Sequence, residues 1–214
     1  DIYEDSSFNW IPEQQIIKAL DKFESLFGEG EVEIYSAPGR TEVGGNHTDH
    51  QHGQVLAASI NIRCHFYHTK TDDGIISLVS EGYDLITIDT ANTELIEEEK
   101  GTTVALIKGV ANEFKNRGYK VGGFKAYITS DVLVGAGLSS SAAFEAVIGT
   151  ILSGLYNDMK ISSVEIAIIS QYAENVYFGK PCGLMDQMAC SVGGFVNIDF
   201  IDPAHPVVNK IDFD

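Results

Sequence analysis

A glycine-rich turn that leads into a serine-rich helix is the first candidate for chemistry in this sequence. The stretch DVLVGAGLSSSAA (131–143) ends an apolar strand pattern, and Ser139, Ser140 and Ser141 open the apolar run behind it. Glycines let the backbone approach a ligand, and a helix N-terminus offers unpaired N–H groups and a positive dipole to an anion. No lysine follows the last glycine as in a Walker A loop, and Ser140 replaces the third glycine of GxGxxG. We predict a phosphate-binding turn, rather than a helix that serine merely caps.

A second stretch, APGRTEVGGNHTDHQHG (37–53), concentrates polar side chains between apolar strands. It contains Arg40, Glu42, His47, Asp49, His50 and His52. Closely spaced His and Asp residues could bind zinc. A neutral histidine and a carboxylate could instead hold adjacent hydroxyls of a polyol, and the segment could also be an ordinary polar loop. The residue types and their spacing leave these three interpretations open.

A third stretch, AENVYFGKPCGLMDQMACSVGG (173–194), places the acid Asp186 in apolar company. A carboxylate in such surroundings is paired with a cation or kept for a function, and Arg40 is the natural candidate partner. The alternative is an aspartate that caps a helix after Gly183. Glu174 lies at the edge of an apolar stripe of the preceding helix, a position that by itself favours the surface.

Hydrophobic periodicity predicts the elements that must position these residues. Helices are expected over 12–27, 103–117, 139–156 and 162–178, and strands over 32–37, 55–60, 64–70, 75–80, 85–89, 123–130, 193–199 and 207–212. In the fourth helix, one stripe is expected to hold Val164, Ile168, Tyr172 and Val176. A strand-rich first half followed by helices and returning strands predicts an α+β fold in one domain over residues 1–214.

Composition excludes several classes of protein. The chain of 214 residues is 44% hydrophobic and 21% charged, as in ordinary globular proteins, and no apolar run is long enough to cross a bilayer. Acidic residues outnumber basic ones by 31 to 14, which gives a net charge of −17. Such a surface repels phosphate backbones and anionic lipid, so neither nucleic acid nor a membrane is expected as a partner.

The cysteines and the N-terminal residues predict a cytoplasmic location. Cys64, Cys182 and Cys190 are an odd, sparse set without CxxC spacing, which favours free thiols in a reducing compartment over disulfides or a zinc site. The first residues, DIYEDSSFNW, lack the basic start and apolar core of a signal peptide.

Taken together, the motifs resemble the galactokinase branch of the GHMP small-molecule kinase superfamily. APGRTEVGGNHTDH is similar to the family's first signature, GAGLSSSAA to its glycine-rich signature, and PCGLMDQ to its catalytic-aspartate segment. Their order and spacing agree over about residues 30–200. The resemblance implies a mixed sheet with packed helices, as in domain 2 of ribosomal protein S5, forming a GHMP N-terminal domain. It also implies transfer of the γ-phosphoryl group of ATP to the C1 hydroxyl of a sugar, with Mg²⁺.

The resemblance also implies roles for individual residues. Asp186 would take the proton of the sugar hydroxyl, and Arg40 would keep Asp186 ionised and stabilise charge on the transferred phosphoryl group. Ser141 and Glu174 would bind Mg²⁺. The phosphates would lie against Gly135, Gly137, Leu138, Ser139, Ser140 and Ser141. The sugar would contact Asn46, His47, Asp49 and Gly183, which makes zinc binding by HTDHQH less favoured.

The sequence departs from the family pattern at several positions. Glu42 and Asn46 exchange the family's asparagine and glutamate, Gly44 and His50 replace an isoleucine and a tyrosine, and Thr103 stands near the family's adenine-contacting aromatic residue. These changes bear on which sugar is bound. The family's C-terminal domain is not in the chain, so we expect residues 1–214 alone not to be a working kinase. A sugar sensor without turnover, and a GHMP kinase for another small alcohol, are the alternatives.

Overall fold

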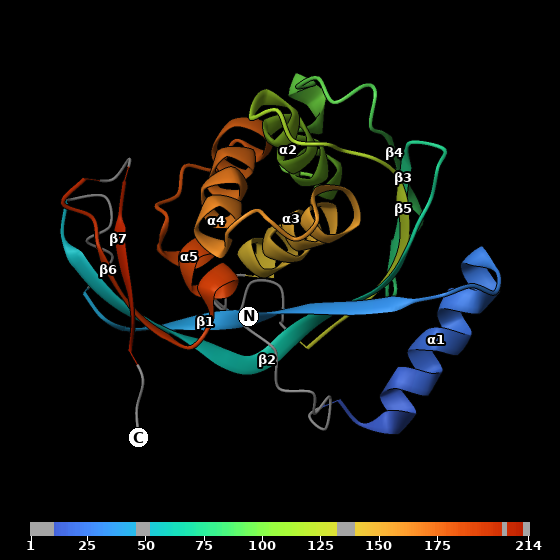
Figure 1. Ribbon diagram of the computed structural model, residues 1–214, viewed down its shortest axis with the longest axis horizontal. Coiled ribbons are helices and arrows are strands. Elements are labelled where there is room, and N and C mark those ends of the chain that lie inside the picture. Colours follow the sequence, from blue (N-terminus) through green and yellow to red (C-terminus); the bar gives the residue numbers. More distant parts are fainter. Residues whose placement is uncertain (1–10, 46–51, 132–139, 203–204, 212–214) are drawn as a thin grey trace.

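The computed structural model describes residues 11–45, 52–131, 140–202 and 205–211 (Figure 1). Within these residues the chain forms a mixed sheet covered on one face by four helices and on the other by a single helix. The fold is therefore the mixed sheet with packed helices that the sequence predicts.

The sheet is organised around one long strand. Its strands are β1 (Glu33–Gly44), β2 (Gln54–Lys70), β3 (Ile75–Ser80), β4 (Ile86–Asp89), β5 (Phe124–Ser130), β6 (Phe195–Asp199) and β7 (Val207–Ile211). The order is β4-β3-β5-β2-β6-β7, and β1 pairs with β2. The pairings are antiparallel except for the parallel pair β3–β5. β2 thus pairs with β1, β5 and β6 and connects the two halves of the sheet.

The helices lie where capping residues and apolar stripes place them. They are α1 (Glu13–Phe27), the short 3₁₀ turn η2 (Glu97–Glu99), α2 (Thr103–Asn116), α3 (Ser140–Asn157), α4 (Ser163–Tyr172), the π-helix η3 (Ala173–Phe178) and α5 (Met185–Val192). The hydroxyls of Thr102 and Ser162 accept the N–H groups of Ala105 and Glu165 in the first turns of α2 and α4. Gly28, at a φ of 87°, ends α1.

Apolar side chains fill both sides of the sheet. Helices α2, α3 and α4 share a large core with β2, β3 and β5, and α5 packs on β6 through Met185, Met188 and Ala189. On the opposite face, Ala19 and Phe23 of α1 pack against a smaller cluster. Within the described residues, no helix combines the length and apolarity needed to cross a membrane.

Three details of the predicted elements are wrong. The strands expected at 55–60 and 64–70 are one strand, β2, because residues 61–63 contain no glycine or proline to break it. The strand expected to end at 37 continues as β1 to Gly44. The helix expected over 162–178 changes to a π-helix after Tyr172, and α5 was not predicted.

Candidate active site

Arg40 and Asp186 form an ion pair between β1 and α5. The Nε–H of Arg40 donates to Oδ1 of Asp186 over 2.6 Å. Only 13% of the arginine side chain is exposed, against 32% for the aspartate, so the carboxylate remains reachable from solvent. The partnership that the sequence predicts is therefore present.

Local backbone features direct both side chains to this point. The pairing of β1 with β2 shifts register between Pro38 and Arg40 and again between Glu42 and Gly44. Such irregularities re-aim side chains, and here they flank Arg40. Asp186 lies in the first turn of α5, but it makes no capping hydrogen bond there; its carboxylate contacts Arg40 instead. The helix-capping interpretation of Asp186 is therefore not what the structure shows.

The Arg40 guanidinium is charged despite its burial. Burial lowers the pKa of Arg40, but the hydrogen bond and the charge of Asp186 raise it by more, so the net pKa is above the usual value. The pair thus places a carboxylate and a permanent cation side by side.

A second group of polar side chains surrounds Glu174. The Ser141 hydroxyl, in the first turn of α3, donates to Oε1 of Glu174 over 3.0 Å. The ammonium of Lys180 lies 3.7 Å from the same oxygen. The Gln187 amide donates to the other oxygen, Oε2, over 2.8 Å. Glu174 is 2% exposed, so the surface position that its sequence context favours is wrong.

The π-helix η3 explains why Glu174 faces inward. Wider turns change which residues share a face, and such segments are frequent at functional sites. As a result, Ala173, Glu174 and Tyr177 are buried, whereas Val176, expected on the buried stripe, is 39% exposed. Gly179 then ends η3 in the left-handed conformation at a φ of 80°, and its N–H donates to the Glu174 carbonyl.

The side chains around Glu174 offer oxygen atoms that could coordinate a divalent cation. Mg²⁺ prefers carboxylate and hydroxyl oxygens with phosphate oxygens completing its shell, and Ser141 and Glu174 already bring two such atoms within 3.0 Å of each other. The buried carboxylate is compensated in this structure by Lys180 and by two hydrogen-bond donors. The residues present therefore fit the metal that the resemblance implies.

Three residues of this region were missed by the sequence analysis. Lys180 gave no signal, since an exposed lysine in a loop is common. Gln187 is fully buried beside Asp186, and Glu145 is fully buried on α3. A detectable signal existed for Glu145, because it is the one acid in an apolar helix, SSSAAFEAVIGTILSGLY. The reasoning that selected Asp186 applies to it equally.

Part of the predicted site lies outside the described residues. This holds for the phosphate-turn residues Gly135, Gly137, Leu138 and Ser139 and for the sugar-contact residues Asn46, His47 and Asp49. Ser140 is the first residue of α3, and Gly183 is half-buried just before α5. The part of the chain that the structure describes has no cluster of three or more metal-ligating side chains, and the HTDHQH segment falls mostly outside it.

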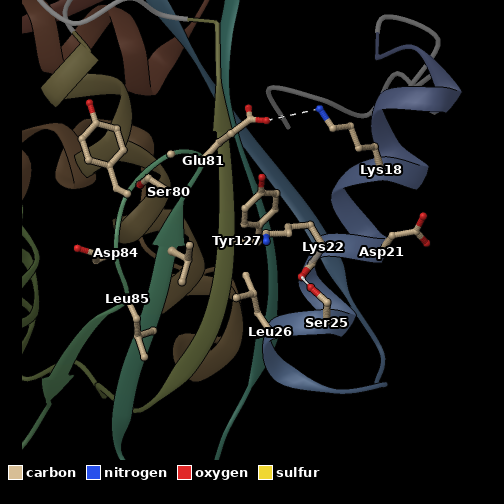
Figure 2. Close-up of a pocket in the computed structure, with 13 residues that line it drawn as sticks. Lys18, Asp21, Lys22, Ser25, Leu26, Ser80, Glu81, Asp84, Leu85 and Tyr127 are labelled. Atoms are coloured by element: carbon tan, nitrogen blue, oxygen red, sulfur yellow. Dashed lines mark hydrogen bonds and ion pairs between the residues drawn. The ribbon is translucent and has the colours of Figure 1, made fainter.

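A groove of about 820 Å³ lies apart from these residues, between α1, the end of β3 with the turn that follows it, and Tyr127 of β5 (Figure 2). Lys18 reaches across it to Glu81, with 3.7 Å between the charged atoms. None of the residues that the sequence predicts to be functional lines this groove. The candidate site is therefore the Arg40–Asp186 pair with the Glu174 group, not the groove.

Two family models and several curated relatives match this chain. The family model of the GHMP kinase N-terminal domain matches residues 105–194, and the galactokinase galactose-binding signature matches residues 21–69. A galactokinase of Pyrococcus furiosus is 37% identical over 169 residues, which cover 78% of this chain and 46% of the relative. A galactokinase of Clostridium tetani is 34% identical over 185 residues, covering 86% of this chain and 47% of the relative.

A solved structure shows the same arrangement of elements. The galactokinase of Lactococcus lactis, crystallised with galactose, has a TM-score of 0.82 and 28% identity, covering 92% of this chain and 52% of its own. The chain thus spans about half the length of the relatives that it matches. The segment that matches the galactose-binding signature contains Arg40, and the segment that matches the GHMP N-terminal domain contains Asp186. The chain is therefore similar to the GHMP kinases over their N-terminal domain model and to the galactokinases over about half of their length.

Proposed function

We propose that the full-length protein transfers the γ-phosphoryl group of ATP to the C1 hydroxyl of galactose or a close relative. The observation that carries the proposal is the 2.6 Å contact between Arg40 and Asp186. It joins a solvent-reachable carboxylate to a cation, and the two segments that supply them lie within the matches to the galactose-binding signature and the GHMP kinase N-terminal domain.

Asp186 is the proton acceptor in this proposal. Phosphoryl transfer needs the sugar hydroxyl to lose its proton as it attacks, and a positioned carboxylate can take it. Arg40 has two tasks, since its hydrogen bond orients the Asp186 carboxylate and its charge stabilises negative charge on the transferred group. The partial burial of both side chains strengthens these electrostatic effects relative to open water.

The nucleotide is assigned to the α3 end of the site. The N-terminus of α3 and the preceding segment, with Gly135, Gly137, Leu138, Ser139 and Ser140, would hold the phosphates. Ser141 and Glu174 would hold Mg²⁺, which supplies charge neutralisation between the phosphates when bound. Lys180, 65% exposed at the edge of this group, is available to contact a phosphate oxygen.

The sugar is assigned to the segment between β1 and β2 and to the start of α5. Asn46, His47 and Asp49 would bind sugar hydroxyls, and Gly183 would allow the backbone to approach the ring. A cytoplasmic location is part of the proposal, and it is supported by the three free cysteines, Cys64, Cys182 and Cys190.

A coupled ADP-release assay with a panel of monosaccharides tests this function on the full-length protein. We expect galactose-dependent ADP release, with a sugar 1-phosphate as the product in ³¹P NMR. Asp186→Asn should lower kcat by about 10²–10⁴-fold while galactose still binds, because the proton acceptor is lost. Asp21→Asn, at an exposed position on α1, is the matched control. Sugar binding without ADP release in the wild type would instead identify a sensor.

A further inference from the structure

Gln187 lies between the two parts of the candidate site. It follows Asp186 in α5 and is fully buried. Its Nε2 donates to Oε2 of Glu174 over 2.8 Å and also contacts Sγ of Cys182 at 3.5 Å. Both hydrogens of the amide group are therefore in use, and the remaining hydrogen-bonding atom of Gln187 is its carbonyl oxygen.

That carbonyl oxygen and the nearby Glu145 carboxyl group are both buried without a satisfied hydrogen bond. Within the described part of the chain, Oε1 of Gln187 and both oxygens of Glu145 have no partner of good geometry. Helix α3, which carries Glu145, packs on α5, and Gln187 is close enough to act on Glu145 by hydrogen bonding. Buried polar atoms are rarely left unpaired in native proteins, so the two unpaired groups need an explanation.

A neutral Glu145 can pair two of these three atoms, its own hydroxyl oxygen and the Gln187 carbonyl oxygen. Gln187 has no free N–H to offer a carboxylate, but its Oε1 can accept a hydrogen bond from a protonated carboxyl group. Burial, and then the neighbouring charge of Glu174, raise the pKa of Glu145 well above its usual value, and Gln187 and the charge of Lys180 oppose this rise without cancelling it. A chain of contacts then runs from Glu145 through Gln187 to Glu174.

We propose that Gln187 is a positioning residue for the metal-binding carboxylate, and that Glu145 fixes the orientation of the Gln187 amide. The proposal rests on the proposed function, because it takes Glu174 as a ligand of the divalent cation that accompanies a nucleoside triphosphate. With Oε2 turned toward Gln187, the other oxygen of Glu174 is presented to Ser141 and to the cation. Groups that hold a metal ligand in this way commonly change metal affinity by about 10–100-fold when removed.

Direct metal binding is the test, with the full-length protein and a non-hydrolysable ATP analogue. The affinity for Mn²⁺, used as a paramagnetic substitute for Mg²⁺, is measured by electron paramagnetic resonance. Gln187→Met keeps the length of the side chain but removes the amide, and it should weaken Mn²⁺ binding about 10-fold or more. Galactose affinity, measured by calorimetry without nucleotide, should remain within about twofold of the wild type, which a general loss of structure would not allow.

The Glu145 variants separate positioning from packing. Glu145→Gln keeps a neutral group that can donate to Gln187, so Mn²⁺ affinity should stay within about twofold of the wild type. Glu145→Met removes the donor at similar volume and should weaken Mn²⁺ binding as Gln187→Met does. Because the two residues act in one chain, the double variant should be no weaker than either single variant. If Gln187→Met does not fold, the comparison of Glu145→Gln with Glu145→Met still tests whether Glu145 orients Gln187.

Glu174→Ala distinguishes failure of this inference from failure of the proposed function. If Glu174→Ala binds Mn²⁺ as the wild type does, the metal assignment is overturned, and the positioning role with it. If Glu174→Ala loses Mn²⁺ but Gln187→Met and Glu145→Met bind it normally, the positioning role alone is overturned. If Glu145→Gln and Glu145→Met weaken Mn²⁺ binding equally, the role assigned to Glu145 is also overturned.

Discussion

Gly109 of α2 faces Ala173 of η3 so closely that no side chain fits between them. A Cβ atom at Gly109 would lie 2.8 Å from the Ala173 Cβ and 2.9 Å from its Cα. This contact lets α2 support the π-helix directly beside Glu174. Gly109→Ala should therefore destabilise the protein by about 1–3 kcal/mol, as overpacking does, and weaken nucleotide-dependent metal binding. Denaturant unfolding and Mn²⁺ titration measure the two effects.

Two further variants control this prediction. Gly30→Ala places a methyl group where no atom lies within 4 Å, so stability and Mn²⁺ affinity should not fall. Ala173→Gly in the Gly109→Ala background removes one of the clashing atoms and should restore part of both properties. Wild-type stability for Gly109→Ala alone would mean that η3 is not held by this contact.

Arg40→Lys should greatly reduce turnover even though it keeps a positive charge. Arg40 uses a fixed planar group to reach Asp186, whereas a lysine ammonium is a mobile point charge. We expect kcat to fall by about 10²–10³-fold, the range for loss of a charge-stabilising donor. Steady-state kinetics provide the measurement, and Lys22→Arg on α1 serves as a control for exchanging the cations. A kcat within threefold of the wild type would exclude a dependence on the guanidinium.

Two buried histidines of β2 should make stability depend on pH. Burial lowers the pKa values of His65 and His68 to about 4, from 6.5 in model compounds; Asp131 and Glu33 respectively oppose this shift without cancelling it. Between pH 6.5 and 4 the unfolded chain therefore binds more protons than the folded one. The contribution of the two neutral histidines to the free energy of unfolding should be at its maximum above pH 6.5. It should fall toward pH 4, by up to about 1.4 kcal/mol per pH unit for each histidine.

Urea unfolding at several pH values between 7.5 and 4.5 measures this dependence. His68→Phe fills the same space beside Tyr35 but cannot bind a proton, so the decrease between pH 6.5 and 4.5 should become shallower. His205→Gln removes an exposed histidine and should leave the slope unchanged. Identical slopes for His68→Phe and the wild type would show that His68 does not contribute.

The exchange of Glu42 and Asn46 should alter sugar specificity. If Asn46 faces C6 of the sugar, as the resemblance implies, its amide can donate or accept hydrogen bonds where a glutamate only accepts. We expect a sugar with a substituted or oxidised C6 to reach a higher kcat/KM than unmodified galactose. Asn46→Glu should reverse that preference. The prediction is wrong if unmodified galactose has the highest kcat/KM of all tested sugars that differ only at C6.

The elements that the sequence predicts well are those bounded by strong local signals. Pro12 and Gly28 enclose α1, and the periodicity over 103–116 marks α2. The Arg40–Asp186 pair was also predicted, because a lone carboxylate among methionines and leucine requires a cation. Those inferences need only residue types and near neighbours along the chain. The sugar-binding role of residues 46–49 and the phosphate-binding role of residues 135–139 remain predictions, because these residues lie outside the described ranges.

The features that were missed depend on contacts made far along the chain. The π-helix that buries Glu174 is not visible in hydrophobic periodicity, because its wider turns displace the stripe by one residue. Helix α5 has eight residues, too few for a clear pattern. The continuity of β2 follows from partners on both sides of its middle, since β6 pairs with residues 54–58, β5 with residues 64–70, and β1 with both halves; no local propensity records such partners.

The separation of Arg40 and Asp186 by 146 positions has a consequence for biosynthesis. A ribosome adds about 5–20 residues per second, so Arg40 leaves the exit tunnel many seconds before its carboxylate partner. During that interval β2 can pair with β1 and β5, but β6 has not yet been made. During this interval the nascent chain lacks the carboxylate that pairs with Arg40, and the edge of β2 that binds β6 is open. Attachment of α5 and β6 ends both conditions at once, which makes this stage the one most dependent on protection by chaperones.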